Sequence, residues 1–405
     1  MSRARVLVTD AGRGSAIAVI RSLGRAGLSV IAADHHPRSA GFRSRYADDQ
    51  LVYADPALEP DAVVELLRDV AVDKRVELII PVSDELLLPL ARARNRFHGV
   101  CALALPDDAA LAQVTDKWST VELALRVGVP VPHTTLVRTA DEAMTAAREV
   151  GWPVVLKPAS SRILRDGRVE RFEVAYADGP EGLEATMARF EGRCRVLVQE
   201  YRAGEAQGVE LLAQEGRTLM AFQHRRLHEV PISGGASSLR EGVPLDLELL
   251  GHATLLLQAL RWTGLAMVEF RVGADGPVLM EVNGRIWGSL PLAVKSGVDF
   301  PLGLASLYLG NRLPGGGPPA GRPQTVGVRS RDLGRELVWI AAVLRRRRRY
   351  PFLEAPPRRA AVSAALRLPL PQDGFDVFSR DDPSPALADA VHAVCRTMRK
   401  VGHVP

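Results

Sequence analysis

The sequence has few cysteines and no long apolar run, and each absence excludes a class of protein. Its three cysteines, Cys101, Cys194 and Cys395, are far apart and odd in number, which fits neither a disulfide framework nor a CxxC metal site. No apolar run approaches the roughly 20 residues that cross a bilayer. The first apolar stretch, residues 6–8, is followed closely by Asp10, unlike a signal peptide. We therefore expect packing roles for the cysteines and a cytoplasmic protein without a transmembrane segment.

Basic charge is confined to one part of the chain. The net charge is +5, but from Asn311 onward there are 17 Lys and Arg against 8 Asp and Glu. That part therefore carries a net charge of +9, and the residues before it carry −4. A nucleic-acid-binding protein more often carries its basic face on a folded domain, with aromatic residues interleaved for stacking. Specific nucleic-acid binding is therefore not expected.

Length and composition predict more than one folded unit. The 405 residues are 47% hydrophobic and 24% charged, which is sufficient for two or three cores. Residues 1–110 alternate short β-branched runs with helical patterns, which predicts a doubly wound α/β fold. The apolar runs lie at 6–9, 30–33, 78–81 and 100–105, and the first helical pattern spans 15–26.

A glycine turn follows the first predicted strand. Gly12 and Gly14 flank Arg13, and Asp34 ends the second strand about 20 residues later, as in a dinucleotide-binding fingerprint. The third glycine of that fingerprint would fall at Ile17, which disfavours close packing of helix on strand. We therefore favour a tight turn in a parallel sheet over an NAD site.

Two lysines in the second region, residues 111–310, are placed by secondary structure. Thr115 or Asp116 caps a helix running to about Arg126, so Lys117 projects from its first turn. An apolar strand ends directly at Lys157. A single lysine is more often an ordinary surface residue, so neither carries an argument alone.

Acidic and amide side chains lie on two later strands of the same region. Strands at 266–272 and 278–283 flank a turn at 274–276, and an antiparallel pair brings residues of one face together. Glu269, Glu281 and Asn283 would then form an oxygen-rich set suited to Mg²⁺. A solvated strand face explains the same spacing equally well.

Several motifs occur in a familiar order, and over residues 1–310 the chain resembles the ATP-grasp superfamily, in particular carbamoyl-phosphate-synthase-like carboxylate–amine ligases. The motifs are Asp116-Lys117, Val155 to Pro158, Gln199-Glu200-Tyr201, Glu269, and Glu281 to Arg285. The resemblance implies a fold of α/β and α+β type, with an N-terminal Rossmann-like pre-ATP-grasp domain at 1–110 and an ATP-grasp domain at 111–310. A basic Pro/Gly-rich linker and C-terminal extension would occupy 311–405.

The resemblance also implies roles for named residues. Lys117 and Lys157 would bind ATP phosphates, and Gln199, Glu200 and Tyr201 would belong to the adenine hinge. Glu269, Glu281 and Asn283 would hold one or two Mg²⁺ ions, with Mn²⁺ as a substitute, and Arg285 would face the transferring phosphoryl group. The glycine turn and residues 81–85 would border the active-site cleft.

A basic stretch precedes the acidic strands. Arg226 follows His224 and is followed by His228 and the Gly234-Gly235 pair. In the carbamoyl-phosphate-synthase-like group such stretches approach the reaction centre, and a guanidinium matches a carboxylate or acyl phosphate. A solvated edge strand is an equal alternative for Arg226. The two histidines lack a third convergent ligand, so packing or surface roles are favoured over a metal site.

The third region, 311–405, offers a Pro/Gly linker at 314–319 and a helical pattern at 331–344. Leu333, Leu337, Ile340 and Leu344 share helical spacing, and the arginines 345–349 follow. A basic amphipathic helix touching anionic lipid or an acidic partner is one interpretation. We favour a packed helix with a solvated basic end.

Three functions compete. The leading one is an ATP- and Mg²⁺-dependent, ADP-forming ligase that activates a small-molecule carboxylate as an acyl phosphate for attack by an amine. Another ATP-grasp phosphoryl-transfer enzyme, either a kinase or a carbamoyl-phosphate-type synthase, comes second. An NAD-dependent oxidoreductase built on the first domain comes third. The sequence indicates neither the acid, the amine nor the oligomeric state.

Overall fold

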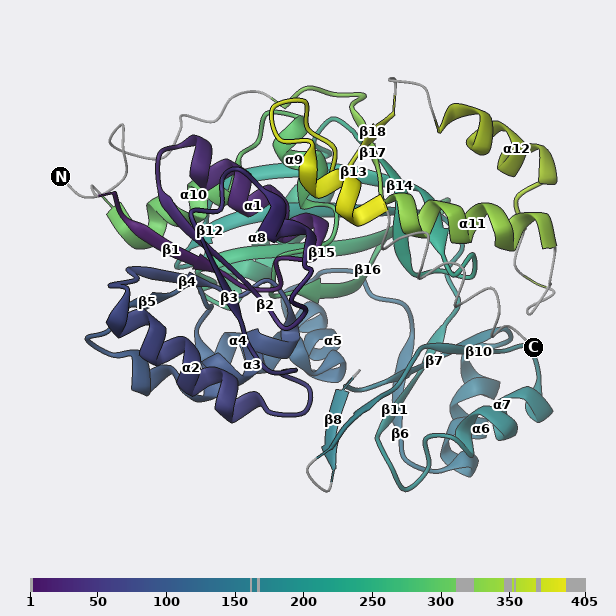
Figure 1. The fold of residues 1–405 in the computed structure, drawn as a ribbon. Coiled ribbons are helices and arrows are strands. Elements are labelled where there is room, and N and C mark those ends of the chain that lie inside the picture. The colour runs from purple at the N-terminus through teal and green to yellow at the C-terminus, as the bar shows by residue number, and fades with distance from the viewer. Residues whose placement is uncertain are drawn as a thin grey trace.

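The computed structural model describes residues 3–160, 162–165, 168–310, 324–345, 352, 355–368 and 373–390. Within these residues the strands form sheets of five, four, seven and two strands, with helices packed on them (Figure 1). The mixed α/β class expected from the sequence is confirmed. No helix among the described residues is long and apolar enough to cross a membrane.

A parallel sheet forms from the first hundred residues, in the order β3-β2-β1-β4-β5. Its central strands are buried on both faces, as the uninterrupted apolar runs require. The strand order reverses between β1 and β4, so the segments that follow these two strands lie side by side. The strands are β1 (Arg5–Val8), β2 (Ser29–Asp34), β3 (Asp49–Val52), β4 (Leu78–Ile80) and β5 (Ala102–Leu103), and the α-helices are α1 (Gly14–Arg25), α2 (Pro60–Asp73) and α3 (Asp84–Arg92).

Two helices, α4 (Asp108–Thr115) and α5 (Lys117–Arg126), lead into an antiparallel sheet with the order β10-β7-β11-β6. Helices α6 and α7 share one apolar core with this sheet. A separate hairpin, β8 (Arg162–Arg165) and β9 (Arg168–Arg171), follows β7. The remaining bounds are β6 (Thr134–Val137), α6 (Ala140–Val150), β7 (Val154–Pro158), β10 (Ala175–Ala177), α7 (Pro180–Met187) and β11 (Val196–Glu200).

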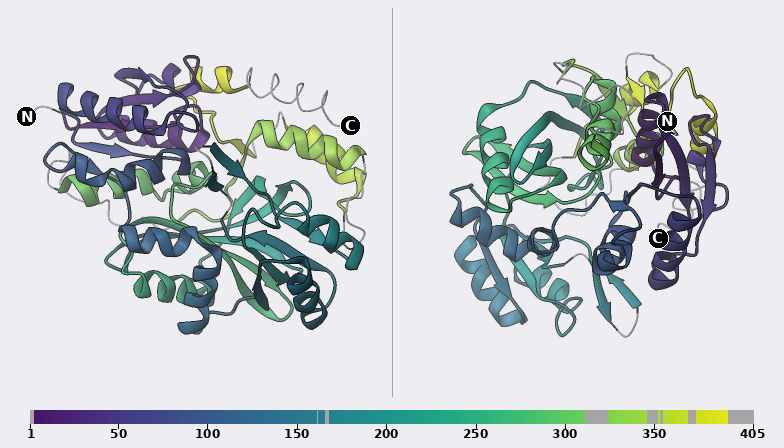
Figure 2. Two further views of the ribbon diagram at one scale, coloured as in Figure 1. Left: turned by 90° about the horizontal axis from the view of Figure 1, so that it is seen from below. Right: turned by 90° about the vertical axis from the view of Figure 1, so that its left-hand side faces the viewer.

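The largest sheet runs β16-β15-β12-β13-β14-β17-β18. One face packs on α8 and on the core of the first sheet, and the other packs on α9, α10 and α1. These two apolar layers join the large sheet to the parallel sheet (Figure 2). The bounds are β12 (Glu205–Gln214), β13 (Arg217–Val230), β14 (Ala236–Gly242), α8 (Leu247–Ala259), β15 (Gly264–Gly273), β16 (Gly276–Asn283), α9 (Leu290–Lys295) and α10 (Phe300–Leu309).

The C-terminal region supplies two strands of this sheet, β17 (Arg329–Arg331) and β18 (Gly374–Phe375), and two helices, α11 (Leu333–Arg345) and α12 (Arg358–Arg367). Helix α11 packs against α12, and its buried residues are Glu336, Trp339, Ile340 and Val343. The packed helix favoured from the sequence is confirmed, but the predicted stripe is right only at Ile340, since Leu333 and Leu337 are partly exposed and Leu344 is 42% exposed. The linker 314–319 and the arginines 346–349 lie outside the described residues.

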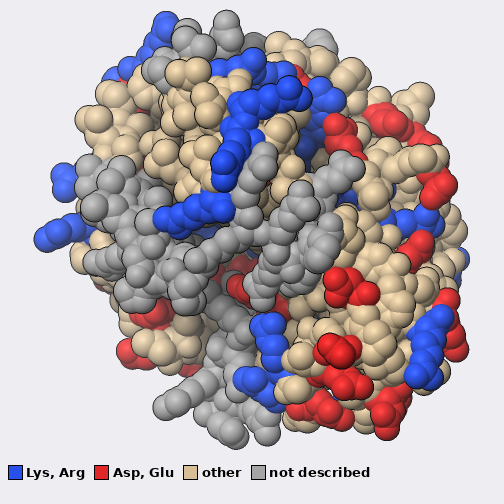
Figure 3. All heavy atoms as spheres, turned by 90° about the vertical axis from the view of Figure 1, so that its right-hand side faces the viewer, with Lys and Arg blue, Asp and Glu red and all other residues tan. Residues whose placement is uncertain are grey.

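Basic side chains are exposed around the C-terminal helices. Arg358, Arg359 and Arg367 of α12 are all exposed, and Figure 3 shows Lys and Arg side chains gathered over the upper part of this face. Contact of this surface with anionic lipid or an acidic partner stays the less favoured interpretation. Of the cysteines, Cys101 and Cys194 are partly buried and packed against apolar cores, while Cys395 is outside the described residues.

Candidate functional site

A cleft of about 2460 Å³ lies where the sheets meet. It is lined by loops of the parallel sheet and by strands of the two antiparallel sheets. All ten side chains selected from the sequence line this one cleft: Lys117, Lys157, Gln199, Glu200, Tyr201, Arg226, Glu269, Glu281, Asn283 and Arg285.

Two carboxylates and an amide meet on the paired strands β15 and β16. Glu269 and Glu281 are direct partners in the antiparallel register. The Asn283 amide donates to Glu269 Oε1 at 3.1 Å and to Glu281 Oε1 at 3.0 Å. A bulge after Glu269 leaves Met280 without a partner on β15, and such a bulge redirects neighbouring side chains. The Asn283 amide nitrogen thus holds one oxygen of each carboxylate close together.

Surrounding charges keep one of the two carboxyls ionised. Burial alone would raise the pKa of Glu281, but Lys117, the Asn283 amide and Lys157 together hold it below its usual value. Burial raises the pKa of Glu269, and nearby Glu281 adds to the rise while Arg226 opposes it. The two carboxyl groups thus have pKa values shifted in opposite directions, and a cation bound between them would stabilise the ionised form of both.

The two lysines are held by the backbone around them. The Asp116 carboxylate caps α5 by accepting from Ser119 N at 2.9 Å, and Lys117 N donates to Ala159 O at 2.9 Å. The first turn of α5 is thereby tied to the residue that follows β7. Burial lowers the pKa of Lys157 to about 8, Glu281 opposes this shift and Lys117 adds to it. Two partly buried cations thus face the carboxylates across the cleft.

The end of β11 offers an unused acceptor. Gln199 is 2% exposed, and its Nε2 donates to Thr134 Oγ1 at 2.9 Å. Its Oε1 is buried without a hydrogen-bond partner among the described residues. The Glu200 carboxylate accepts from His133 N at 3.2 Å and lies 3.2 Å from Arg202 Nε. A buried orphan acceptor is a feature that a ligand donor would satisfy.

Aromatic rings gather beside this strand end. The ring of Tyr201 lies 6.3 Å from that of Tyr176 and 5.4 Å from that of Phe352, both in edge-on arrangements. Tyr176 is itself anchored, since its hydroxyl donates to Ser233 O at 2.6 Å. The three rings and Gln199 form an apolar wall with one polar handle, as ligand pockets commonly do.

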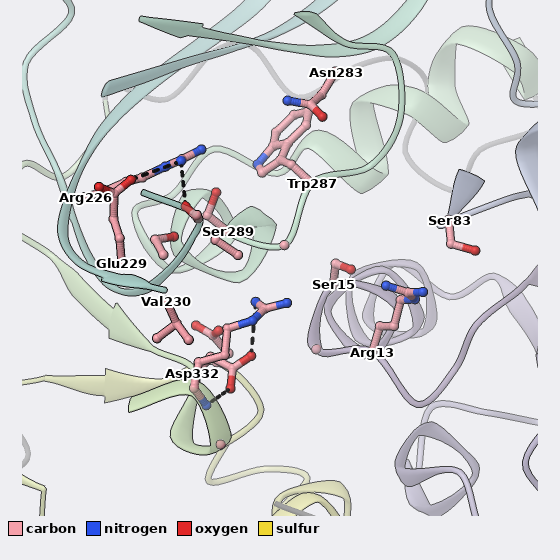
Figure 4. A pocket seen from close by; sticks show the side chains of 18 of the residues that line it. Arg13, Ser15, Ser83, Arg226, Glu229, Val230, Asn283, Trp287, Ser289 and Asp332 are labelled. Carbon is pink, nitrogen blue, oxygen red and sulfur yellow. Dashed lines mark hydrogen bonds and ion pairs between the residues drawn. The ribbon is translucent and has the colours of Figure 1, made fainter. Parts of the chain in front are cut away.

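The two arginines are positioned by ion pairs. Arg226 Nη2 lies 2.5 Å from Glu269 Oε2, and Nη1 lies 3.3 Å from Glu229 Oε1 (Figure 4). Strand β13 has neighbours on both sides, so the edge-strand alternative for Arg226 was wrong. Arg285 Nε donates to Asp84 Oδ2 at 3.1 Å, which links the end of β16 to the start of α3.

The histidines before Arg226 have separate partners. His224 lies against the Glu210 carboxyl in the sheet interior, and burial lowers the pKa of this imidazole to about 3. His228 Nδ1 lies 2.9 Å from Glu336 Oε1, and its ring stacks on Trp339 at 3.6 Å. In the part of the chain that the structure describes, no three His, Cys, Asp or Glu side chains form a metal-binding group.

The glycine turn after β1 also lines the cleft, but its acid is already occupied. Asp34 Oδ2 accepts from Gly12 N at 2.6 Å and from Ser39 Oγ at 2.9 Å. Asp34 Oδ1 accepts from His36 N at 2.8 Å. These hydrogen bonds fix the loop, and both carboxylate oxygens of Asp34 accept from it. Ile17 is fully buried and packs on Ala40.

Sequence reasoning missed the residues that line the cleft from beyond Arg285. Trp287, Ser289, Asp332 and Asp376 line it together with the first turn of α1 (Figure 4). These side chains lie in short loops, Asp332 directly after β17 and Asp376 directly after β18, where no alternation or helical spacing develops. Gly288 between them gives no signal either, since a Cβ there would make only an ordinary 3.6 Å contact with Arg335 Nη1.

Comparisons with known proteins agree with the cleft. Residues 109–212 match the family described as "ATP-grasp domain", and residues 193–329 match "ATP-grasp in the biosynthetic pathway with Ter operon". The chain belongs to the ATP-grasp superfamily. The two matched segments of this ATP-grasp chain contain Gln199 to Tyr201 and the carboxylate strands β15 and β16.

A curated relative of this ATP-grasp chain is the carbamoyl phosphate synthase large chain of Xylella fastidiosa. It is 27% identical over 259 residues, covering 59% of this chain and 23% of the relative. The chain thus spans about a quarter of the length of such relatives.

Solved structures share the fold. The biotin carboxylase domain of Hydrogenobacter thermophilus 2-oxoglutarate carboxylase, in complex with MgADP, ADP and bicarbonate, has a TM-score of 0.63 and 19% identity. The match covers 80% of this chain and 73% of the carboxylase chain. N5-carboxyaminoimidazole ribonucleotide synthetase with ADP has a TM-score of 0.64 and 13% identity, covering 90% and 96%. At these identities the likeness concerns the fold alone.

Proposed function

We propose that this protein binds ATP and Mg²⁺ in the cleft and activates a carboxylate as an acyl phosphate, which an amine then attacks. The observation that carries the proposal is the Glu269–Glu281–Asn283 set facing Lys117 and Lys157 in one cleft. Membership of the ATP-grasp superfamily supports the nucleotide and the ion.

The donor set fits the ion that this chemistry needs. Mg²⁺ prefers carboxylate oxygens together with phosphate oxygens and water, and Glu281 is held ionised by its neighbours. Glu269, Glu281 and Asn283 would hold one or two such ions. Bound there, Mg²⁺ supplies charge neutralisation to the phosphate oxygens.

The chain's own residues would perform the rest. Lys117 and Lys157 neutralise the triphosphate, and Gln199, Glu200 and Tyr201 hold the adenine at the end of β11. Arg285 and Arg226 orient the acid and the transferring phosphoryl group. We propose residues 1–110 as the pre-ATP-grasp domain, 111–310 as the ATP-grasp domain and 311–405 as a C-terminal extension.

The proposed reaction has two steps. A carboxylate oxygen attacks the γ-phosphorus, the bond from that phosphorus to the β,γ-bridging oxygen breaks, and ADP leaves. The amine nitrogen then attacks the carbonyl carbon of the acyl phosphate and loses a proton, the carbon–oxygen bond to phosphate breaks, and phosphate leaves. Lysines and arginines reduce the repulsion between carboxylate and triphosphate and hold the attacking oxygen in line.

The direct test is nucleotide turnover. Incubation with ATP, Mg²⁺ and pooled amino acids should form ADP and phosphate, and omission of either Mg²⁺ or the amino acids should lower the rate. Formation of AMP and pyrophosphate, or no ATP turnover with any pool of acids and amines, would count against the proposal.

A further inference from the structure

One part of the cleft lies beyond the carboxylate strands, and we call it the α1 subsite. Its walls are the first turn of α1, the loop 286–289 and the segment 376–390, each of which contributes residues that line the cleft. These three segments are far apart in the sequence. Figure 4 shows Ser15 and Arg13 on one side of this space, and Trp287 and Ser289 across from them.

Hydrogen bonds, an ion pair and close packing join the three walls. Arg240 is fully buried, donates to Gly288 O at 3.3 Å and pairs with Asp376. Ser330 Oγ donates to the other oxygen of Asp376 at 2.5 Å. At the start of α1, a Cβ on Gly14 would lie 3.4 Å from Val377 Cγ2. The walls are therefore packed together rather than adjacent by chance.

Residues beyond Val377 are anchored to the first sheet. Arg21 Nη1 donates to Val377 O at 2.7 Å, and its Nε pairs with Asp382 at 2.8 Å. Ser44 Oγ donates to Asp382 at 2.6 Å. Both Arg21 and Asp382 are buried. Residues 376–382 are thus fixed from the large sheet on one side and from the first sheet on the other.

One wall presents a hydrogen-bond donor that nothing in the described chain uses. Trp287 is fully buried, and its Nε1 has no hydrogen-bond partner among the described residues. Buried indole N–H groups normally find an acceptor. Trp287 follows Arg285 by two residues, so an acceptor bound at Nε1 would lie next to the residues that we propose for phosphoryl transfer.

The opposite wall is apolar and open to the cleft. Phe378 is 49% exposed and Leu387 is 70% exposed, and both line it. Val377, Ala386 and Ala390 line it beside them. Large apolar side chains exposed in a concave site indicate an apolar ligand group.

We propose that the α1 subsite binds a small carboxylic acid with an apolar side chain. Trp287 Nε1 donates to a carboxylate oxygen, and Phe378 and Leu387 cover the side chain. The C-terminal residues 376–390 thereby determine which substrate is used. This inference rests on the proposed function, since it names the class of acid that is activated.

Thermal unfolding with chosen probes tests the inference. Unfolding midpoints are first measured with Mg²⁺ and the non-hydrolysable ATP analogue AMP-PNP. Four probes are then added: 4-methylpentanoate and 3-phenylpropanoate, which have both features, succinate, which lacks the apolar side chain, and 3-methylbutylamine, which lacks the carboxylate. Both apolar acids should raise the midpoint saturably, and the other two should not.

Variants locate the effect. Leu387→Asp and Phe378→Ser change exposed side chains and should raise the half-saturating concentration of the two acids at least tenfold. Trp287→Phe keeps an aromatic ring, although a smaller one, and removes the N–H donor; it should also raise the half-saturating concentration of the two acids at least tenfold. Leu247→Asp is the matched control, because Leu247 is 82% exposed and does not line the cleft.

The outcomes separate the two proposals. A midpoint unchanged by Mg²⁺ and AMP-PNP would contradict the proposed function, whatever the acids do. Stabilisation by nucleotide but by neither apolar acid would overturn the α1 subsite alone. Equal stabilisation by succinate or the amine, or equal behaviour of the control and the three variants, would also overturn it.

Discussion

At the scale of single residues, the chemistry depends on where strands end and which face a side chain takes. Lys157, Glu269 and Glu281 could be selected from the sequence because each follows or interrupts a short apolar strand. The bulge at Met280 could not be predicted from the sequence, because nothing in the local sequence distinguishes it. The pairing of Arg285 with Asp84 joins residues about 200 positions apart, which no spacing rule predicts.

Glu281→Gln should lower Mg²⁺-dependent ATP turnover by more than about 100-fold while the fold survives. The substitution keeps size and shape but removes the charge that Lys117 and Lys157 hold in place. Steady-state ADP formation measures the effect, and circular dichroism checks the fold. Glu205→Gln on β12 is the control, because Glu205 does not line the cleft. Normal turnover by folded Glu281→Gln protein would refute the metal assignment.

The affinity for ATP should fall as pH rises through about 8. Because burial lowers the pKa of Lys157 to about 8, this side chain is a cation below that pH and neutral above it, where it no longer attracts phosphate. Calorimetry at several pH values should show weakening by up to about tenfold per pH unit above 8.

Two variants of Lys157 check the cause of this pH dependence. Lys157→Arg stays charged and should lose the pH dependence, and Lys157→Ala should bind ATP weakly at every pH. A wild-type affinity that is constant from pH 7 to 9.5 would contradict this role of Lys157.

At the scale of elements, predictions succeeded where a repeat was long enough to read. The apolar runs of the first sheet and the capped start of α5 gave usable patterns. The stripe of α11 was misassigned because Glu336 is buried by contacts with His228 and Ser238, which come from distant strands. Strands β17 and β18 are three and two residues long, too short to alternate.

Breaking the anchor between α1 and the C-terminal residues should destabilise the protein. Arg21→Ala leaves the buried Asp382 without its ion pair, and losing one partner of such a pair costs about 3–5 kcal/mol. Urea unfolding measures the loss. Arg25→Ala on the same helix breaks a pair with Asp381 that is about 40% exposed, and should cost less than about 1 kcal/mol. Similar small losses in both variants would show that the C-terminal residues are not anchored in this way.

At the scale of the whole molecule, the sequence motifs fall in one cleft because three sheets converge on it. The order of the motifs along the chain and the resemblance to ATP-grasp proteins made this convergence predictable. The contribution of residues 376–390 was not predictable, since it depends on ion pairs with Arg21 and Arg240. Those pairs exist only once the sheets have packed.

The first sheet should bind neither NAD nor NADP. Asp34, which would hold a ribose, already accepts from Gly12 N, Ser39 Oγ and His36 N, and Ile17 fills the position of the packing glycine. Titration with NADH, followed by nicotinamide fluorescence, should show no saturable enhancement. Saturable enhancement that Gly12→Val abolishes would favour an oxidoreductase instead.

The most direct test of the account is to trap the activated acid. Hydroxylamine converts an acyl phosphate into a hydroxamate without any need for the natural amine. With ATP, Mg²⁺, hydroxylamine and pooled carboxylic acids that include apolar ones, we predict hydroxamate and ADP in equal amounts, and neither above background with Glu281→Gln. ADP formed without hydroxamate, or hydroxamate accompanied by AMP and pyrophosphate, would contradict activation of a carboxylate as an acyl phosphate.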